Sequence, residues 1–453
     1  PNDPTVAKEF LDFITPLPEL KNDLDNPITV DEVLAAIKAL NNSTPGPDSI
    51  PAFIYKKHSK LIAPLLLDEF RNAIVNERLP TSMATAAIRY IQKKNSDCST
   101  PKGWRPISLI NLDSKVFSTI FTNRLHSIID KLIPEQKAYI RGRNILENIF
   151  SLDALLSDKD NPVYAFFSDF SNAFDTVSHD WIFAVLEKFG FGPYFVSAIK
   201  TLLSNLSAHP IVGSSVKYKH SIPIERGVRQ GDPISGLLFI IAIQPLLLAV
   251  QKTYPDVKIL AYADDLLAYT HNHQRLQNVV DLYIRFALAS GLKLNEQKSL
   301  TTFTSWIHSL TQIYNIPIEF HDFTYLGYVF QWYGVEKELN HLLPKLESAF
   351  TLYKRFKLSL LQKATVINSF IYPKVLYSMY ASSPSNSFFD CVDKMTKWFL
   401  SNITDAYDKN KTYIPRMRLE RLYRPVQKGG IGLASIRGKY WSIKLQLLLR
   451  HLS

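Results

Sequence analysis

Two short apolar runs near the middle of the chain flank a pair of adjacent carboxylates. The runs, Ile259–Tyr262 and Leu266–Tyr269, are too short for helices and predict the arms of a tight β-hairpin. A turn at Ala263 and Asp264 would bring the carboxylates of Asp264 and Asp265 to one side of its tip. Two such charges at a buried tip are costly unless a cation balances them. A pair of Mg²⁺ ions would do so, because hard cations bind carboxylate oxygens, although for the dipeptide alone a solvated turn is the more ordinary interpretation.

The elements on either side of this hairpin extend the pattern to a β-α-β-β-α-β succession. Val163–Phe167 is continuously apolar, as a buried central strand should be. In chain order the expected elements are strand Val163–Phe167, helix Ile234–Val250, the hairpin, helix Arg275–Ser290 and strand Leu300–Thr304. This is the order of the split ferredoxin-like unit, with an insertion after the first strand. An α+β fold is therefore expected.

Helical patterns occupy much of the remaining chain. Thr29, with Glu32 three residues later, predicts a capping box at the start of one helix. Asp232 as the N-cap, with Pro233 at the first helical position, predicts the start of another. After Gly334 the pattern is mostly helical.

Composition and charge indicate an ordered globular protein with a polyanionic partner. At 453 residues, with 46% hydrophobic and 12% aromatic side chains, the chain is expected to form two or three subdomains. Its formal net charge is +11. Residues 409–453 carry eleven Lys or Arg against one acid, and hence nearly all of that excess. A solvated basic face is the ordinary interpretation of a basic run, but one so lopsided favours phosphate contact.

Cysteine usage and hydropathy indicate which compartment and which kind of partner the protein is expected to have. Cys98 and Cys391 provide neither a disulfide framework nor metal-ligand spacing, so a reducing compartment is expected. The longest apolar run, residues 236–250, contains Gln244-Pro245 and is expected to be too short to span a bilayer. No signal peptide is visible, and no membrane partner is expected. Because the chain begins at Pro1, it is expected to be a piece of a longer protein.

A third carboxylate, Asp169, follows the first strand of the succession. In the split unit this strand lies beside the hairpin, so Asp169 would meet Asp264 and Asp265. Two-metal phosphoryl transfer needs such a clamp, because one ion lowers the pKa of an attacking hydroxyl while the other neutralises the leaving group. For Asp169 alone, a strand-end cap is the ordinary interpretation.

Three of the 16 glycines fall within Arg226–Gly236. Glycine lets the backbone approach a ligand closely. Arg229 and Gln230 stand just before the expected helix N-terminus, where phosphate or base contact is favourable. A purely packing role for these glycines is the alternative.

Several segments, taken in order, resemble the characteristic blocks of reverse transcriptases, and specifically those of LINE-type non-LTR retrotransposons (the polymerase portion of the second open reading frame protein). They are Trp104–Leu109, Asp169–Asp175, Arg229–Ser235, Tyr262–Asp265, Gly291–Asn295 with Gln297–Ser299, and Tyr325–Tyr328. Pro45–Asp48 and Gly429–Leu433 are similar to further non-LTR features. The resemblance covers nearly the whole chain, and so many blocks in the right order make it specific.

The resemblance implies a right-hand polymerase with a ferredoxin-like palm, fingers, a helical thumb and a basic C-terminal extension. The implied regions are residues 1–60 (N-terminal extension), 61–160 (fingers), 161–334 (palm, with a fingers insertion at about 176–225), 335–405 (helical thumb) and 406–453 (basic C-terminal segment). The implied activity is that of an RNA-directed DNA polymerase, which extends a 3′-OH primer on an RNA template by two-metal nucleotidyl transfer in target-primed reverse transcription.

The same resemblance assigns roles to individual residues. Asp169, Asp264 and Asp265 match the metal-binding catalytic carboxylates, with the backbone carbonyl of Phe170 as a further ligand. The implied cofactors are two Mg²⁺ ions, with Mn²⁺ as a substitute. Lys298 resembles the acid for the departing pyrophosphate, with a solvated surface lysine as the alternative.

Four more residues resemble the nucleotide pocket, together with Phe170. Lys93 (or its neighbour Lys94) and Arg105 match residues that hold the triphosphate. Gln230 is similar to the residue that braces the nucleotide. Phe174 matches an aromatic steric gate that would clash with a 2′-hydroxyl and so select deoxynucleotides, with a core aromatic as the alternative.

The implied nucleic-acid contacts come from four segments. They are Arg141 and Arg143 in a template-contacting loop, Arg229, the primer grip Tyr325, Leu326, Gly327 and Tyr328, and a template or target clamp of Arg416, Arg418, Arg421 and Arg424.

The expected partners are an RNA template, a DNA primer or target DNA, and dNTPs. Neither an endonuclease domain nor a cysteine-histidine knuckle is visible, so an endonuclease is expected elsewhere in a longer parent chain. The family implies a ribonucleoprotein of the nucleus and cytoplasm. Two alternatives stay open: a group II intron-like or domesticated reverse transcriptase, and a catalytically dead RNA-binding scaffold, which the presence of all three aspartates disfavours.

Overall fold

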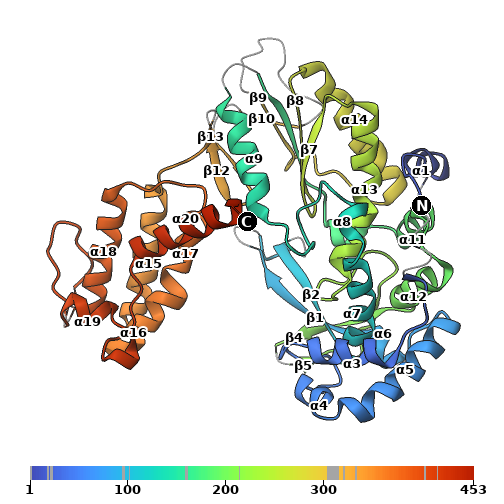
Figure 1. The fold of residues 1–453 in the computed structure, drawn as a ribbon, viewed down its shortest axis with the longest axis horizontal. Helices are drawn as coiled ribbons and strands as arrows, with labels where there is room; N and C mark the ends of the chain where they lie inside the picture. Colours follow the sequence, from blue (N-terminus) through green and yellow to red (C-terminus); the bar gives the residue numbers. More distant parts are fainter. Residues whose placement is uncertain are drawn as a thin grey trace. The chain divides into compact units, whose positions relative to one another are not determined.

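The chain forms two compact units (Figure 1). The computed structural model describes residues 3–17, 20, 24–93, 97–100, 103–158, 162–213, 215–303, 316–319, 322–331, 334–401, 403, 405–415 and 417–452. The first unit comprises residues 1–145 and 161–319, and the second comprises residues 146–160 and 320–453.

The first unit is built around a five-stranded sheet of order β10-β9-β3-β8-β7. The strands are β3 (Tyr164–Ser168), β7 (Lys258–Tyr262), β8 (Asp265–Thr270), β9 (Leu300–Phe303) and β10 (Ile318–Glu319). β3 pairs antiparallel with both β8 and β9, and β7 and β8 form the expected hairpin. Since α13 (Ser235–Thr253) precedes β7 and α14 (His273–Ser290) separates β8 from β9, the chain follows the β-α-β-β-α-β order predicted from the sequence.

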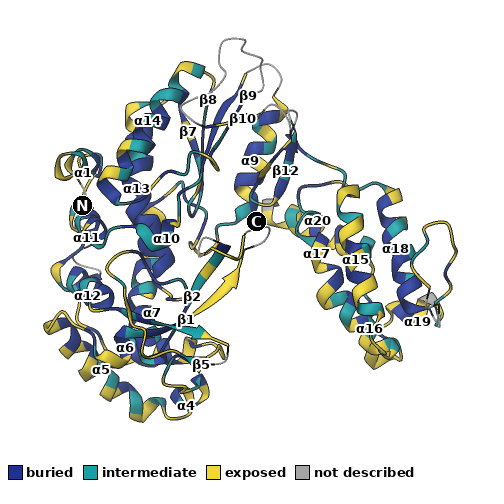
Figure 2. Cartoon of the chain, turned by 180° about the vertical axis from the view of Figure 1, so that it is seen from behind, coloured by how far each residue is buried: buried dark blue, intermediate teal, exposed yellow. Residues whose placement is uncertain are grey.

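The core helix of this unit is α13. Nearly all of its side chains from Ser235 to Val250 are buried, and Figure 2 colours most of the helix dark blue. Among the described residues it is the one helix long and apolar enough, by length and composition, to cross a membrane. The helix continues through Pro245 to 19 residues and so is longer than the apolar run of residues 236–250 considered from the sequence. Its apolar surface packs against α11 (His179–Phe189) and α14, as that of a core helix does.

A second sheet in the same unit has the order β2-β1-β4-β5, with β6 also paired to β4. Its strands are β1 (Thr85–Gln92), β2 (Trp104–Ile110), β4 (Ser207–Val212), β5 (Ser215–Val216) and β6 (Ile222–Pro223). β1 is antiparallel to β2 and parallel to β4. In the sequence, α3 (Val30–Ala39) and α5 (Ser59–Val75) precede β1, and α7 (Leu112–His126) follows β2. The helix α3 packs against both α5 and α7.

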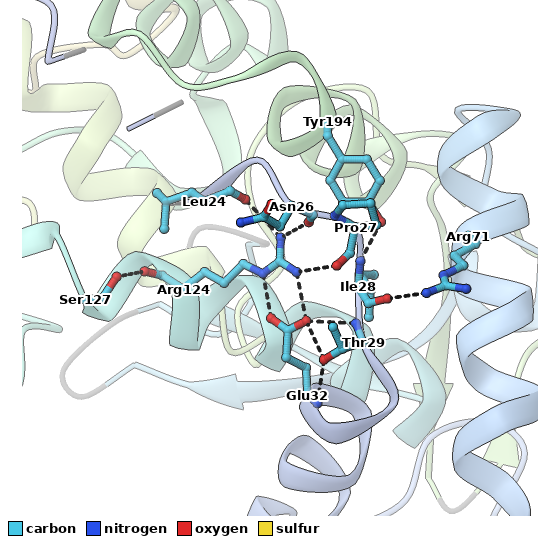
Figure 3. Close-up of polar contacts among 10 residues, drawn as sticks. All are labelled: Leu24, Asn26, Pro27, Ile28, Thr29, Glu32, Arg71, Arg124, Ser127 and Tyr194. Carbon is cyan, nitrogen blue, oxygen red and sulfur yellow. Dashed lines mark hydrogen bonds and ion pairs between the residues drawn. The ribbon is translucent and has the colours of Figure 1, made fainter. Parts of the chain in front are cut away.

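One arginine fastens the segment before α3 to α7. Figure 3 shows the Arg124 guanidinium pointing at three main-chain oxygens, at 2.9, 2.6 and 3.4 Å, from Leu24, Asn26 and Pro27. It also donates to both carboxylate oxygens of Glu32, at 2.7 and 2.8 Å. Glu32 completes the predicted capping box with Thr29. Arg124 therefore joins the start of α3 to α7.

The other described helices of the first unit are short. They are α1 (Pro4–Leu11), α4 (Ala52–Lys57), α6 (Thr81–Ala84), α8 (Ile129–Leu132), α10 (Ala173–Thr176), α11 and α12 (Pro193–Leu203).

The start of α13 differs from the sequence prediction. The helix begins at Ser235 with Ile234 as its N-cap residue, so Asp232 is not the cap. An arginine side chain competes for the carboxylate: Arg229 Nη2 lies 2.7 Å from Asp232 Oδ2. The other oxygen, Oδ1, still accepts from the Ile234 N–H at 3.4 Å, so Asp232 shapes the turn before the helix.

The second unit combines α9 (Ile145–Ser157, whose first residue falls in the first unit), a small sheet and a helical bundle. The antiparallel sheet consists of β11 (Phe323–Tyr325), β12 (Tyr328–Gln331) and β13 (Gly334–Val335). The helices are α15 (Leu343–Lys354), α16 (Leu360–Val366), α17 (Pro373–Leu376), α18 (Asn386–Leu400), α19 (Leu419–Tyr423) and α20 (Ile436–Leu452), with single turns at Asn340–Leu342, Ile367–Ile371 and Val426–Lys428. Phe350, Tyr372, Trp398 and Phe399 are among its buried core. The predicted helical character after Gly334 is confirmed.

Candidate active site

A cavity of about 1100 Å³ opens in the first unit where separated segments of the chain meet. Its wall contains nine of the residues that the sequence singles out. They are Lys93, Arg105, Asp169, Phe170, Phe174, Gln230, Asp264, Asp265 and Lys298. The two sheets and the loops that follow their strands therefore bring these side chains to one place.

Neighbouring strands deliver the three carboxylates. Asp169 directly follows β3, and Asp265 opens β8. Because Ser168, the last residue of β3, lies opposite Leu266, Asp169 emerges at the end of the sheet where the hairpin turns. Asp264 stands in that turn. The strand register, and not only the motif, therefore brings the carboxylates together.

Burial raises the pKa of each of these carboxyls, and repulsion between carboxylates adds to it for Asp264 and Asp265. For Asp265 burial is the largest cause, followed by the charges of Asp264 and Asp169, and its pKa reaches about 6. The pKa of Asp264 is raised mainly by burial and also by the charge of Asp169, while the charge of Arg105 lowers it. Burial also raises the pKa of Asp169, although Lys298 lowers it. This wall of the cavity carries concentrated negative charge and favours a cation.

The donor chemistry of this wall fits a divalent ion. Divalent cations such as Mg²⁺ take oxygen ligands, and Asp169, Asp264 and Asp265 supply carboxylates on one wall. In the described part of the chain, no three His, Cys, Asp or Glu side chains are already gathered closely enough to form a metal-binding group. The fit lies in ligand chemistry and in the negative charge gathered on this wall, and not in a finished coordination geometry.

Phe174 enters the cavity wall from α10. Its ring stacks on Phe239 and meets Tyr139 at an angle of 68°, with ring centroids 6.1 Å apart. The main chain around it is also fixed: the Val228 N–H donates to the Phe174 carbonyl at 2.7 Å. Close approach here depends on Gly227, where an added Cβ would lie 2.6 Å from the Phe174 carbonyl oxygen.

Gln230 reaches the cavity opposite Asp175. Its Nε2 lies 3.3 and 3.4 Å from the two carboxylate oxygens of Asp175. Its carbonyl accepts from the Ser108 N–H at 2.8 Å, which ties the loop to β2. Burial raises the pKa of Asp175, against the hydrogen bond from Gln230. The main chain of Gln230 is thus held by the second sheet and its side-chain amide by Asp175.

Three basic side chains complete the wall. Arg105 lies on β2 opposite Ile91 and is exposed, and the Lys93 N–H donates to the Gly103 carbonyl at 2.8 Å where β1 and β2 separate. The charges of Lys298 and Lys93 both lower the pKa of Asp169. The cavity therefore has an acidic wall with cations within electrostatic reach.

Three arginines predicted to contact nucleic acid do not line this cavity. Arg229 is buried in its ion pair with Asp232, the two side chains being 2% and 5% exposed. This burial removes the surface that the predicted contact needs, because moving the arginine outward would leave the carboxylate unpaired. Arg143 is mostly buried and donates to the main-chain oxygens of residues 133, 134 and 136. Arg141 is exposed and donates to Asn123 Oδ1 at 3.0 Å.

The remaining predicted residues belong to the second unit. Leu326 and Gly327 form the turn between β11 and β12, with φ of 47° and 83°. Tyr325 and Tyr328 are buried, and the Tyr328 hydroxyl donates to the Tyr377 carbonyl. The side chains of Arg418, Arg421 and Arg424 are exposed. Arg416 lies outside the described residues.

Tyr139, Asp175 and Asn295 line the cavity although no role was predicted for them. Tyr139 has φ of 62°, and an added Cβ at Gly236 would lie 2.4 Å from its ring. In the sequence, Gly236 indicates a close contact at this position, but the sequence does not reveal that Tyr139 is the residue in contact. Asp175 and Asn295 both lie inside the segments that resemble reverse transcriptase blocks, Asp169–Asp175 and Gly291–Asn295.

Comparison with known proteins agrees with this geometry. Residues 91–330, about half of the chain, match the family model described as reverse transcriptase (RNA-dependent DNA polymerase). The match covers every segment that contributes a residue to the cavity.

Several transposon proteins are similar in sequence. The chain is 27% identical over 478 residues to the transposon TX1 uncharacterized 149 kDa protein of Xenopus laevis, which covers 100% of the chain and 35% of that protein. It is 27% identical to a Pol polyprotein from the type-1 retrotransposable element R2 of Popillia japonica (91% of the chain, 58% of that protein). It is 30% identical to the probable RNA-directed DNA polymerase from transposon BS of Drosophila melanogaster (60% of the chain, 32% of that protein). The chain spans about a third to somewhat more than half of the length of these relatives.

Proposed function

Because the chain belongs to the reverse transcriptase (RNA-dependent DNA polymerase) family, we propose that it extends a 3′-hydroxyl primer with deoxynucleotides along an RNA template. The observation that carries this proposal is the convergence of nine predicted residues on one acidic cavity. A nucleotidyl transfer site needs charge stabilisation at the triphosphate and a rigid floor beneath the sugar. The lining of this cavity contains both the charged side chains and the Phe174 ring that these two tasks need.

The carboxylates are proposed to hold divalent ions, as reverse transcriptases do, and the specific choice of two Mg²⁺ ions (or Mn²⁺ in their place) is part of the proposal. Asp169, Asp264 and Asp265 would bind them, with the carbonyl of Phe170. When bound, such ions lower the pKa of the primer hydroxyl and neutralise the departing pyrophosphate. The protein's own contribution is to fix the ligand oxygens through the register of β3 and β8.

The other cavity residues are proposed to hold the nucleotide. Lys93 and Arg105 would bind the triphosphate, since a point charge and a planar fork suit phosphate oxygens. Gln230 would brace the base and sugar, and Phe174 would exclude a 2′-hydroxyl. Lys298, whose charge reaches Asp169, would give a proton to the pyrophosphate.

The right-hand organisation is likewise a proposal. Its palm, residues 161–334, would include the five-stranded sheet, with fingers at residues 61–160 and about 176–225, a thumb at 335–405, and the extensions 1–60 and 406–453. The β11–β12 turn is proposed as the primer grip, Arg141 as a template contact, and the exposed arginines Arg418, Arg421 and Arg424 as a clamp on RNA or target DNA.

The names of the relatives support a retrotransposon origin. We propose that the chain serves target-primed reverse transcription in a ribonucleoprotein of the nucleus and cytoplasm, as part of a longer protein that carries an endonuclease. Relatives named for the R2, BS and TX1 transposons favour this over a group II intron-like or domesticated enzyme. A catalytically dead scaffold would have no use for the three aspartates.

The test is primer extension on an RNA template with dNTPs and Mg²⁺, comparing the wild type with Asp264→Asn. Removing one charge from the carboxylate wall should lower the extension rate at least about 100-fold, as losing a group that stabilises transition-state charge does. RNA affinity should change little and the unfolding midpoint should not fall, because the amide keeps the shape of the side chain and removes a buried carboxyl whose pKa is raised. Tight RNA binding without extension by either protein would favour the scaffold.

A further inference from the structure

The turn that carries the carboxylates holds a strained residue. Ala263 has φ of 54°, in the left-handed region that costs a residue with a Cβ appreciable free energy. Ala263 is buried, so its main-chain N–H and C=O need partners inside the protein. Some other part of the chain must supply these partners and hold the turn.

Gln136 supplies both partners. Its Oε1 accepts from the Ala263 N–H at 2.7 Å, and its Nε2 donates to the Ala263 carbonyl at 3.2 Å. The Gln136 side chain is fully buried, which makes these hydrogen bonds costly to lose. A side-chain amide is suited to the task because it offers both an N–H donor and an oxygen acceptor at the spacing of a peptide group.

The segment around Gln136 is itself anchored to the hairpin. The Lys137 N–H donates to the Ala261 carbonyl at 2.9 Å, and Gln136 forms a parallel bridge with Ala261. On the other side, Arg143 donates to the Gln136 carbonyl at 2.7 Å and pairs with Asp130. The position of the Gln136 side chain is therefore set by the backbone on both sides.

A second glutamine contact fastens the same segment to α13. Glu135 accepts hydrogen bonds from Gln244 and Gln251 at 3.2 and 2.9 Å. These bonds hold the segment to the core but do not touch the turn. They provide a comparison in which a hydrogen bond from an α13 amide to the same segment is lost without altering the contacts of Ala263.

We propose that Gln136 is a positioning residue for the carboxylates of Asp264 and Asp265, acting through the main chain of Ala263. The inference rests on the proposed function and gives a role in it to Gln136, which does not line the cavity. Since φ of Ala263 sets the direction in which the chain enters Asp264, relaxing it would turn both carboxylates away from Asp169. Gln136 fixes the φ that keeps the three carboxylates on one wall.

The test compares Gln136→Met with Gln251→Met as the control. Gln136→Met keeps the volume but removes the two hydrogen bonds to Ala263, together with those that Oε1 accepts from the Lys137 and Ala138 N–H at 3.1 Å each. Gln136→Met should lower kcat for single-nucleotide addition roughly 100-fold, the effect of misplacing reacting groups by about 1 Å. KM for the dNTP should stay within about threefold, because Lys93 and Arg105 are untouched. Gln251→Met should leave kcat within about threefold of wild type, with a similar unfolding midpoint.

Two further measurements do not depend on activity. Affinity for Mn²⁺, followed by electron paramagnetic resonance, should fall about tenfold in Gln136→Met, as it does when groups behind metal ligands are removed. Hydrogen exchange over residues 259–268 should become faster. Adding Ala263→Gly to Gln136→Met should recover part of kcat, because glycine adopts positive φ without strain.

Each contrary result is decisive. Wild-type kcat and exchange rates in Gln136→Met would overturn the inference, and so would equal losses in Gln136→Met and Gln251→Met, which would mean that the segment acts only through folding. Should the wild type fail to extend primers while Mn²⁺ affinity and exchange still depend on Gln136, the proposed function would fail and the positioning role would stand.

Discussion

Phe174 stacks on Phe239 with ring centroids 4.4 Å apart and ring planes inclined by 19°. Phe239 belongs to the core helix α13 and is fully buried. The Phe174 ring therefore rests on the core while the residue lines the cavity. A ring supported in this way cannot swing aside when a sugar approaches, which is what a steric gate requires.

Replacing Phe174 by valine should weaken discrimination against ribonucleotides. Removing the ring opens space for a 2′-hydroxyl, so the ratio of kcat/KM for CTP to that for dCTP should rise roughly 100-fold, the range that one steric contact in a pocket provides. Single-turnover incorporation on an RNA template measures both values. Tyr139→Phe, which keeps the neighbouring ring, should leave the ratio unchanged. An equal loss with both nucleotides would instead assign Phe174 to packing.

Gly227→Ala should displace Phe174 through a clash with its main chain. The new Cβ would lie 2.6 Å from both the Phe174 carbonyl oxygen and the Asp175 carbonyl carbon, at a φ of 77°. Main chain cannot yield as a flexible side chain can, so stability should fall by about 2–3 kcal/mol and KM for dNTPs should rise. Gly142→Ala separates crowding from backbone strain, because Gly142 has φ of 84° and nothing within 4 Å of an added Cβ. Urea unfolding should give it a loss of only about 1 kcal/mol.

The cavity was predictable where local pattern and chemistry agree. A continuously apolar strand followed by Asp169 and a hairpin tipped with Asp264 and Asp265 can be placed from spacing and charge alone. The strand register then brings them together, as the β-α-β-β-α-β order requires. Such features depend on residues close in sequence, and the structure confirms the elements that carry them.

Other features depend on tertiary partners that no local pattern names. The sequence predicts that Arg229 is an exposed cation in a glycine-rich loop. In the structure its side chain is buried, because it forms an ion pair with Asp232 three residues later. Gln136 reads as an ordinary polar residue, and its importance lies in the distant main chain of Ala263. The N-cap of α13 was misplaced for the same reason, since the carboxylate of Asp232 was already engaged.

Arg124→Met should destabilise the first unit. It removes the two bonds to Glu32 and the bonds to the main-chain oxygens of residues 24, 26 and 27 before α3 (Figure 3). Burial raises the pKa of Glu32, but hydrogen bonds from Arg124 and Thr29 bring it below its ordinary value. We expect a loss of about 2–4 kcal/mol in urea unfolding. Lys188→Met, which breaks an exposed pair with Asp12, should cost far less. Equal losses would contradict the special role of Arg124.

The exposed arginines of the C-terminal segment should control the salt dependence of RNA binding. Replacing Arg418, Arg421 and Arg424 by glutamine removes up to three phosphate contacts. The slope of log K against log salt should therefore become shallower by roughly 2, at about 0.7 for each single-strand contact. Fluorescence anisotropy with a labelled RNA at several salt concentrations measures this slope. Arg437→Gln is the control, because its guanidinium is paired with Asp390 at 2.7 Å. An unchanged slope in the triple variant would remove these arginines from the interface.

Asp113, in the first turn of α7, should make stability depend on pH. Burial, and among the charges mainly the nearby Asp48, raises its pKa to about 6 from an ordinary 3.8, although Arg229 and a hydrogen bond from the Ser114 N–H oppose the shift. A carboxyl whose folded pKa is raised binds its proton more tightly in the folded state. Its contribution to stability therefore falls as pH rises from about 4 to about 6, and the fall amounts to about 3 kcal/mol.

Asp113→Asn removes this titration and keeps an oxygen that can accept from the Ser114 N–H. The variant should be more stable than wild type by about 3 kcal/mol at pH 8, with the difference shrinking below about 1 kcal/mol at pH 4. Urea unfolding of both proteins at each pH measures the difference, in which other buried acids such as Asp265 cancel because both proteins contain them. A gain of equal size at both pH values would mean that the asparagine improves packing, and that Asp113 titrates normally in the folded chain.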